Sequence, residues 1–215
     1  AAAGAPSHSI HLKPLAEDAL SLPVRTGKAR VIGIEPASLV TKSLVREVKT
    51  DDAGCFQSAL NPGLTKIAVI ERHKRTGKLG IGILEGYGLT GGAIATTISH
   101  DSHNIVVAGD NDPDMLLAVR ELADMGGGIV SVHGGAIRRL PLPIAGLMTS
   151  ADPQEVNAVL HDMLVAARAE LGIPEDVEPF MTLSFMALPV IPELKLTARG
   201  LFNVNTFSFV GVEAD

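Results

Sequence analysis

The chain has 215 residues, of which 46% are hydrophobic, 20% are charged and only 3% are aromatic, and its formal net charge is -6. A chain of this length and composition can bury its own core, which excludes an intrinsically disordered protein. The negative charge and the scarcity of aromatic side chains disfavour a nucleic-acid partner, because such partners need cationic contacts and stacking platforms.

The single cysteine, Cys55, excludes an internal disulfide and is typical of a reducing compartment, so we expect a cytoplasmic protein. No apolar run reaches the roughly 18 residues of a membrane span, so we expect no membrane partner.

Residues 1–28 are interrupted by three prolines and are predicted to form a linker or arm that lies over a surface. The chain opens with Ala1–Pro6 and without a methionine, so we expect it to be part of a longer polypeptide. A folded domain is predicted for residues 29–215.

Short runs rich in β-branched residues, separated by turn residues, predict a series of strands. Within one of them, Ile67 and Val69 are predicted to lie on the face opposite to Ala68, because side chains alternate along a strand. The predicted strands cover residues 28–34, 39–48, 65–72, 79–84, 92–99, 105–109, 128–132, 136–140 and 206–210. The strands 128–132 and 136–140 are predicted to be the two arms of a hairpin around residues 133–135.

Two helices are predicted from cap residues and helical spacing of apolar side chains. The first begins near Asn111 and ends before Gly126, and the second covers residues 150–172. The apolar stretch 179–197 is interrupted by prolines, which argues against a central strand. Strands and hairpins that alternate unevenly with two main helices predict an α+β domain with a mixed, mostly antiparallel sheet, and not a TIM barrel.

The segment from Gly77 to Gly92 is rich in glycine, as phosphate-binding loops are. It lacks the third glycine of the dinucleotide fingerprint and the Gly-Lys-Ser/Thr of a phosphate-binding loop. Glycines that alternate within a strand more often mark the close approach of another backbone. We therefore interpret the segment as closely packed and not as a nucleotide site.

The polar sequence His100-Asp101-Ser102-His103-Asn104, hereafter the histidine loop, connects two predicted strands. Such a connection lies at a sheet edge or a cleft mouth, where polar groups can meet a ligand. Imidazole can donate or accept a hydrogen bond, or bind a metal, near neutral pH. One interpretation assigns the loop's catalytic candidates, His100, Asp101, His103 and Asn104, to substrate or active-site contact. In the other interpretation, both histidines hydrogen-bond to the backbone and hold the sheet edge. The residue types alone do not decide between the two interpretations.

Two further features are interpreted as structural. The run Glu71–Arg75 carries three basic residues and a histidine, and we expect a solvated strand end and not a docking patch. Cys55 has no cationic neighbour in the sequence that would activate its thiol.

Four segments in the same order resemble the C-terminal region of bacterial adenine deaminases: Lys28–Ile34, Ser99–Asn104, Leu140–Met148 and Phe180–Thr197. Enzymes of that family are metal-dependent amidohydrolases that hydrolyse adenine to hypoxanthine and ammonia. The resemblance implies that this chain is the C-terminal domain of such an enzyme, which acts in purine salvage and adenine catabolism. It also implies that the chain alone is inactive.

In the family, a TIM-type barrel precedes this region and supplies the metal ligands, beginning with a His-x-His pair. The close histidine pairs of this chain, His8/His11 and His100/His103, are separated by two residues instead. The resemblance therefore implies a divalent metal, manganese or iron, whose ligands are not in this chain, and we assign no metal ligand or cofactor-binding residue here. It further implies adenine as the substrate of the full-length enzyme, the missing amidohydrolase barrel as a partner, and a homo-oligomer.

Two alternatives stay open. The first is a stand-alone metal-binding hydrolase in which His100, Asp101 and His103 hold one metal with an open position. The second is a structural or oligomerisation domain that uses the apolar stretch 179–197 as a contact surface.

Overall fold

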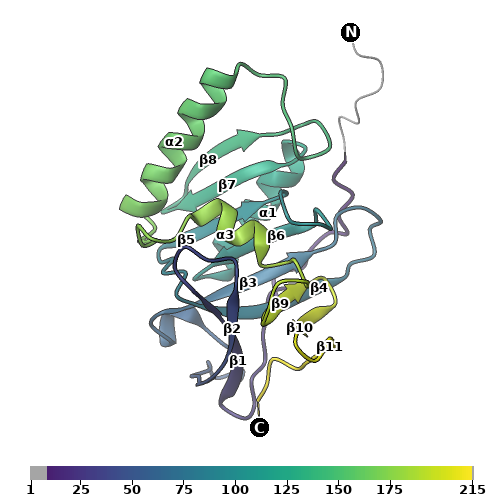
Figure 1. The fold of residues 1–215 in the computed structure, drawn as a ribbon, viewed down its shortest axis with the longest axis vertical. Coiled ribbons are helices and arrows are strands. Elements are labelled where there is room, and N and C mark those ends of the chain that lie inside the picture. The colour runs from purple at the N-terminus through teal and green to yellow at the C-terminus, as the bar shows by residue number, and fades with distance from the viewer. Residues whose placement is uncertain (1–8, 215) are drawn as a thin grey trace.

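An eight-stranded sheet forms the centre of the computed structural model, which describes residues 9–214 (Figure 1). Its strands are β1 (Lys28–Ile34), β2 (Thr41–Glu47), β3 (Leu64–Ile70), β4 (Leu79–Glu85), β5 (Gly92–Thr96), β6 (Ile105–Gly109), β7 (Gly128–His133) and β8 (Ala136–Pro141). They lie in the order β2-β1-β4-β3-β6-β5-β7-β8. β1 and β4 are parallel, and the other neighbouring strands pair antiparallel. The predicted α+β fold is therefore confirmed, with a mixed, mostly antiparallel sheet that is open and has β2 and β8 at its edges.

The central strands are buried on both faces. In β3, Ile67 and Val69 join the core on one side of the sheet, and Ala68 and Ile70 join the core on the other side, as the alternation predicts. Burial of both faces needs a layer of structure on each side, and the helices and a second sheet provide these layers.

One face of the sheet is covered by α1 (Asp112–Asp124), which packs against β5, β6 and β7. The side chain of Asn111 caps the helix by accepting from the main-chain N–H of Asp114, and a proline occupies its first turn. The helix ends before Gly126, as predicted, and buries Met115 and Leu122 against the sheet.

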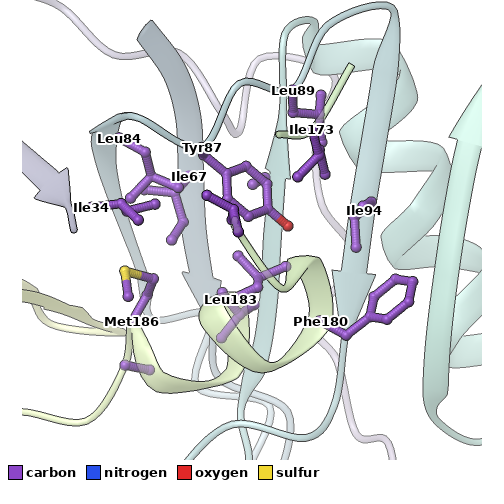
Figure 2. Packing of buried hydrophobic residues seen from close by; sticks show 14 of the residues in the cluster. Ile34, Ile67, Leu84, Tyr87, Leu89, Ile94, Ile173, Phe180, Leu183 and Met186 are labelled. Carbon is purple, nitrogen blue, oxygen red and sulfur yellow. The ribbon is translucent and has the colours of Figure 1, made fainter. Parts of the chain in front are cut away.

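The other face is covered by α2 (Pro153–Ala169), α3 (Pro179–Phe185) and a small sheet of β9 (Leu194–Thr197), β10 (Gly200–Asn203) and β11 (Ser208–Phe209). Figure 1 shows α3 crossing in front of the large sheet, with α2 and the small sheet to either side of it. Figure 2 shows Leu183 and Met186 lying beneath Tyr87 and Leu84. The hydroxyl of Tyr87 donates to the carbonyl of Pro179 at 2.9 Å, so this buried ring has its polar atom bonded.

The stretch 179–197, which one of the two alternatives uses as a contact surface, lies mostly in the interior of the domain. It forms α3 and β9, and most of its side chains lie in the domain's own core. Glu178 caps α3 and Pro179 stands in its first turn, so this proline starts a helix where the sequence had only argued against a strand. Met181 and Val190 remain well exposed, at 55% and 65%, which leaves only isolated apolar side chains on the surface.

The glycine-rich segment is closely packed, as interpreted. A Cβ placed on Gly80 in β4 would lie 2.0 Å from the carbonyl oxygen of Thr197 in β9. A Cβ on Gly92 in β5 would lie 1.9 Å from the carbonyl oxygen of Val132 in β7. Neither distance is sterically possible, so each glycine allows another backbone to approach.

Residues 9–27 contain no helix or strand, and three of their apolar side chains, Leu20, Leu22 and Val24, are buried against the sheet. An isolated bridge between Pro23 and Cys55 joins this arm to the loop after β2, which contains the short 3-10 turn η1 (Ser58–Leu60). The part of the predicted arm before Ser9 lies outside the described residues. Among the helices of residues 9–214, none is long and apolar enough to cross a membrane.

Candidate functional site

The histidine loop connects β5 to β6, two neighbouring strands in the middle of the large sheet. Both strands are completely buried, so the loop has a rigid base. Asp101 and Ser102 are exposed at its tip, whereas Ser99 and Asn104 are buried where it joins the strands. The loop therefore places some of its polar groups at the surface and others in the interior.

His100 is held by α3. Its main-chain N–H donates to the carbonyl of Ser184 at 3.0 Å, and its ring lies on the ring of Phe185 with 4.5 Å between centroids. The ring borders a pocket of about 410 Å³ between α3, α2 and the ends of β5 and β7. Its lining is mostly apolar, with Glu178 as the one carboxylate, and comprises Thr96, Ile98, His100, Ile129, Leu160, Glu178, Phe180, Met181, Ser184 and Phe185. A largely apolar group with a few polar atoms fits such a lining.

His103 lies on the inner side of the loop. Its main-chain N–H donates to the carbonyl of Ser99 at 2.6 Å, and its backbone has a left-handed φ of 47°, which is uncommon for a residue other than glycine. Burial lowers the pKa of its ring, and the nearby charges of His100 and Arg72 lower it further, while Asp101 opposes them. His103 is therefore a neutral imidazole near neutral pH, able both to donate and to accept.

Unpartnered polar atoms concentrate at this loop. Within residues 9–214, four buried side-chain nitrogen or oxygen atoms have no hydrogen-bond partner, and three of them belong to Ser99, His103 and Asn104. The His103 atom is Nδ1 and the Asn104 atom is Oδ1. Because an unbonded buried polar atom costs about 1–3 kcal/mol, such atoms are rare in native proteins and need an explanation.

Arg72 corrects the prediction of a solvated strand end. The other residues from His73 to Arg75 are exposed, but Arg72 is only 1% exposed and extends beneath the histidine loop. Its guanidinium donates to the carbonyl of His103, as well as to acceptors of Ser9 and Ala145. The run of charged residues does not indicate this burial, because the segments that cover Arg72 are distant in the sequence.

The loop's catalytic candidates are only partly brought together. The rings of His100 and His103 lie edge to face with 6.1 Å between centroids, whereas Asp101 is exposed at the tip. Within residues 9–214, no group of three or more histidine, cysteine, aspartate or glutamate side chains is placed to hold a metal ion. The described residues therefore do not fit a metal held by this chain, and the three ligands needed by a stand-alone hydrolase do not converge. His8, of the pair His8/His11, lies outside the described residues.

A larger hollow of about 620 Å³ lies beside the edge strand β2 and its neighbour β1. Its charged groups, Lys28, Arg46, Glu47 and Lys49, come from strand ends, and no histidine lines it. Arg46 in this hollow is already paired with Glu85 at 2.6 Å. The histidine loop therefore remains the candidate site, because it combines two imidazoles and three unpartnered buried polar atoms with an adjoining apolar pocket.

Known proteins match this chain along nearly its whole length. The family described as "Adenine deaminase C-terminal domain" matches residues 38–208. A protein named adenine deaminase from Nitratidesulfovibrio vulgaris strain Hildenborough is 58% identical over 205 residues, which are 95% of this chain and 35% of that protein. One from Clostridium acetobutylicum is 44% identical over 205 residues, and "Adenine deaminase 2" from Carboxydothermus hydrogenoformans is 47% identical over 206 residues. Each of these two alignments covers 95% of this chain and 36% of the relative.

The chain thus spans about a third of the length of the curated relatives that it matches. The family match covers the histidine loop, α2 and α3, which together form the candidate site. This chain belongs to the adenine deaminase C-terminal domain family.

Proposed function

We propose that this chain is the C-terminal portion of an enzyme that hydrolyses adenine to hypoxanthine and ammonia, and that the histidine loop forms part of its active site. The observation that carries the proposal is the combination of a pocket-lining His100 with a neutral His103 and three unpartnered buried polar atoms at one loop. Relatives named adenine deaminase, up to 58% identical among those compared, support the activity.

The reaction adds the oxygen of water to the carbon that bears the amino group of adenine. The carbon–nitrogen bond then breaks, and the departing amine takes a proton and leaves as ammonia. Purine edges alternate hydrogen-bond donors and acceptors, and a neutral imidazole can serve either kind of atom. His103 and His100 suit the work of holding the ring and moving a proton, and general acid–base groups typically contribute about 10²–10⁴-fold to a rate.

The apolar pocket beside His100 suits one face of a purine. Ile98, Ile129 and Phe185 provide apolar contact, and Glu178, whose carboxylate also caps α3, offers an acceptor for an N–H group. Asp101 and Ser102 are exposed at the tip, from which they can reach a partner domain.

We also propose that the metal, manganese or iron, is held by a preceding barrel that this chain does not include. The support is that the relatives named adenine deaminase are about three times as long as this chain. The enzyme's place in purine salvage and adenine catabolism, its cytoplasmic location and its assembly as a homo-oligomer are proposals that follow from the resemblance.

The test replaces His100 and His103 separately by alanine in the intact deaminase. Ammonia release from adenine is expected to fall at least about 100-fold in each variant, while the bound metal, measured by elemental analysis, stays constant. His161→Gln is the matched control, because His161 is an exposed histidine on α2, away from the loop. If both alanine variants turn over adenine as fast as the control, the histidine loop is not part of the active site.

A further inference from the structure

Arg72 has an unusual position for a cation. It is only 1% exposed, and its guanidinium bonds to oxygen atoms of three separate segments of the chain. Nε donates to the carbonyl of His103, and Nη1 donates to the carbonyl and the hydroxyl of Ser9 at 3.2 and 2.9 Å. Nη2 donates to the carbonyl of Ala145 at 2.9 Å. One side chain therefore joins the N-terminal arm, the histidine loop and the loop after β8.

No carboxylate among the described residues compensates this charge. The adjacent Glu71 points elsewhere, because its carboxylate accepts from the main-chain N–H groups of His73, Lys74 and Thr76 and from the Thr76 hydroxyl. Burying a cation without an anionic partner is unfavourable by several kcal/mol. A neutral residue of similar size would avoid this penalty, so the position is poorly explained by stability alone.

The packing around the guanidinium is close. At Gly146, next to the Ala145 acceptor, an added Cβ would lie 3.0 Å from Nη1. Gly146 also has a φ of 71°, which favours glycine. The backbone of this segment is thus shaped to approach Arg72.

The side chains of Arg72 and His73 together fix two successive carbonyls of the histidine loop. Nε2 of His73 donates to the carbonyl of Ser102 at 2.8 Å, and Arg72 donates to the carbonyl of the next residue, His103. A hydrogen bond from a charged donor is about twice as strong as a neutral one. Arg72 therefore fixes the backbone at the residue that has the left-handed conformation, and this conformation sets the direction of the His103 ring.

We propose that Arg72 is a positioning residue for the active site: through the His103 carbonyl it holds the histidine loop in the geometry that presents His103. This inference rests on the proposed function of the loop. Lysine cannot replace Arg72, because a single ammonium nitrogen cannot reach acceptors that are spread around a planar guanidinium.

The electrostatic surroundings of His103 give a second readout. His100, Arg72 and His73 are the positive or titratable groups that lower the pKa of His103, and Asp101 raises it. Removing the Arg72 charge is expected to raise the pKa of His103, whereas lysine keeps the charge and loses the geometry. The two substitutions therefore separate position from charge.

The experiment uses Arg72→Lys and Arg72→Ala in the intact deaminase, with Arg120→Lys as the control, since Arg120 is exposed on α1. Both Arg72 variants are expected to lose at least about tenfold in kcat, because a small misplacement of a reacting group has effects of this size. KM is expected to change less. The acidic limb of the pH profile of kcat/KM is expected to move to higher pH by more in Arg72→Ala than in Arg72→Lys, because only the alanine variant loses the charge. Millimolar guanidinium is expected to restore part of the kcat of Arg72→Ala.

Amide hydrogen exchange of residues 99–104 measures the loop without reference to activity. Exchange at least about tenfold faster in both Arg72 variants than in the control, together with the loss of kcat, supports the proposal. Unchanged amide exchange in the Arg72 variants overturns the proposal. If His103→Ala inactivates the enzyme, faster exchange with an unchanged kcat in the Arg72 variants overturns it as well. If His100→Ala and His103→Ala are both fully active, the proposed function fails instead, and the exchange result still decides whether Arg72 holds the loop.

Discussion

Three buried cations show how differently a charge is accommodated in this domain. Lys66 is paired with Asp112 at 2.5 Å, which compensates its charge. Arg72 has no carboxylate partner among the described residues and donates instead to four neutral oxygen atoms. Lys195 in β9 is fully buried, and its ammonium group donates to one main-chain carbonyl, that of Leu39, at 2.8 Å. Lys195 is thus the least compensated of the three, and burial lowers its pKa from 10.5 to about 8.

We expect Lys195→Met to stabilise the domain at pH 7. The folded pKa lies below the unfolded value, so the unfolded state binds more protons between pH 8 and 10.5 and the wild-type free energy of unfolding rises over that interval. At about 1.4 kcal/mol per pKa unit, the wild-type penalty at pH 7 is about 3 kcal/mol. Losing the bond to the Leu39 carbonyl offsets part of this gain, so we expect a net increase of about 1–3 kcal/mol at pH 7.

Urea unfolding of both proteins at pH 7 and pH 10 measures this effect, and their difference cancels the titration of other groups. The advantage of the methionine variant should shrink as the pH rises from 8 to 10. Lys66→Met is the contrasting variant and should destabilise, because it leaves Asp112 without its partner. The account is contradicted if Lys195→Met has no higher free energy of unfolding than the wild type at pH 7. It is also contradicted if the difference between the two proteins is larger at pH 10 than at pH 7.

At the scale of elements, the small sheet is joined to the large one through Gly80. We expect Gly80→Ala to lower the free energy of unfolding by about 3 kcal/mol or more, because the new methyl group would overlap the Thr197 carbonyl and push β9 away from β4. Chemical denaturation with urea gives the value. Gly211→Ala is the matched control, since a Cβ there meets nothing closer than 3.6 Å. Equal stability of the two alanine variants would show that the sheets are not closely packed at Gly80.

The sequence predicted most strands and both long helices, because their signals are local. Alternation in β3 and the Asn111 cap of α1 are examples, and both are confirmed. By contrast, α3 was missed although Glu178 and Pro179 form a typical helix start, since the prolines of that stretch were interpreted only as strand breakers. β9 and β10 were also missed, because each is only four residues long and is defined more by pairing with its neighbouring strand than by its own sequence.

The candidate site was predictable only in part, for the same physical reason. The density of polar groups marked the histidine loop in the sequence. The burial of Arg72 depends on Ser9 and Ala145, which are 63 and 73 residues away in the chain, so no local pattern could indicate it. The pocket beside His100 likewise depends on α3 folding back onto the ends of β5 and β7.

At the scale of the whole molecule, the chain forms a domain with its own core and with a candidate site at the end of its central strands. The histidine loop lies at the end of the central strands, with Asp101 and Ser102 exposed, and the described residues hold no group placed for a metal. The relatives extend over about three times the length of this chain. We propose that the domain supplies positioning and hydrogen-bonding groups to a centre that another part of the enzyme completes.

Ammonia release from adenine by the 215-residue chain alone, with Mn²⁺ or Fe²⁺ added, tests this claim most directly. Cooperative urea unfolding of the same sample verifies that the chain is folded. The account predicts no ammonia above the uncatalysed rate from the chain alone, and turnover when the same domain is part of the intact deaminase. Metal-dependent ammonia release by the folded chain alone would contradict it.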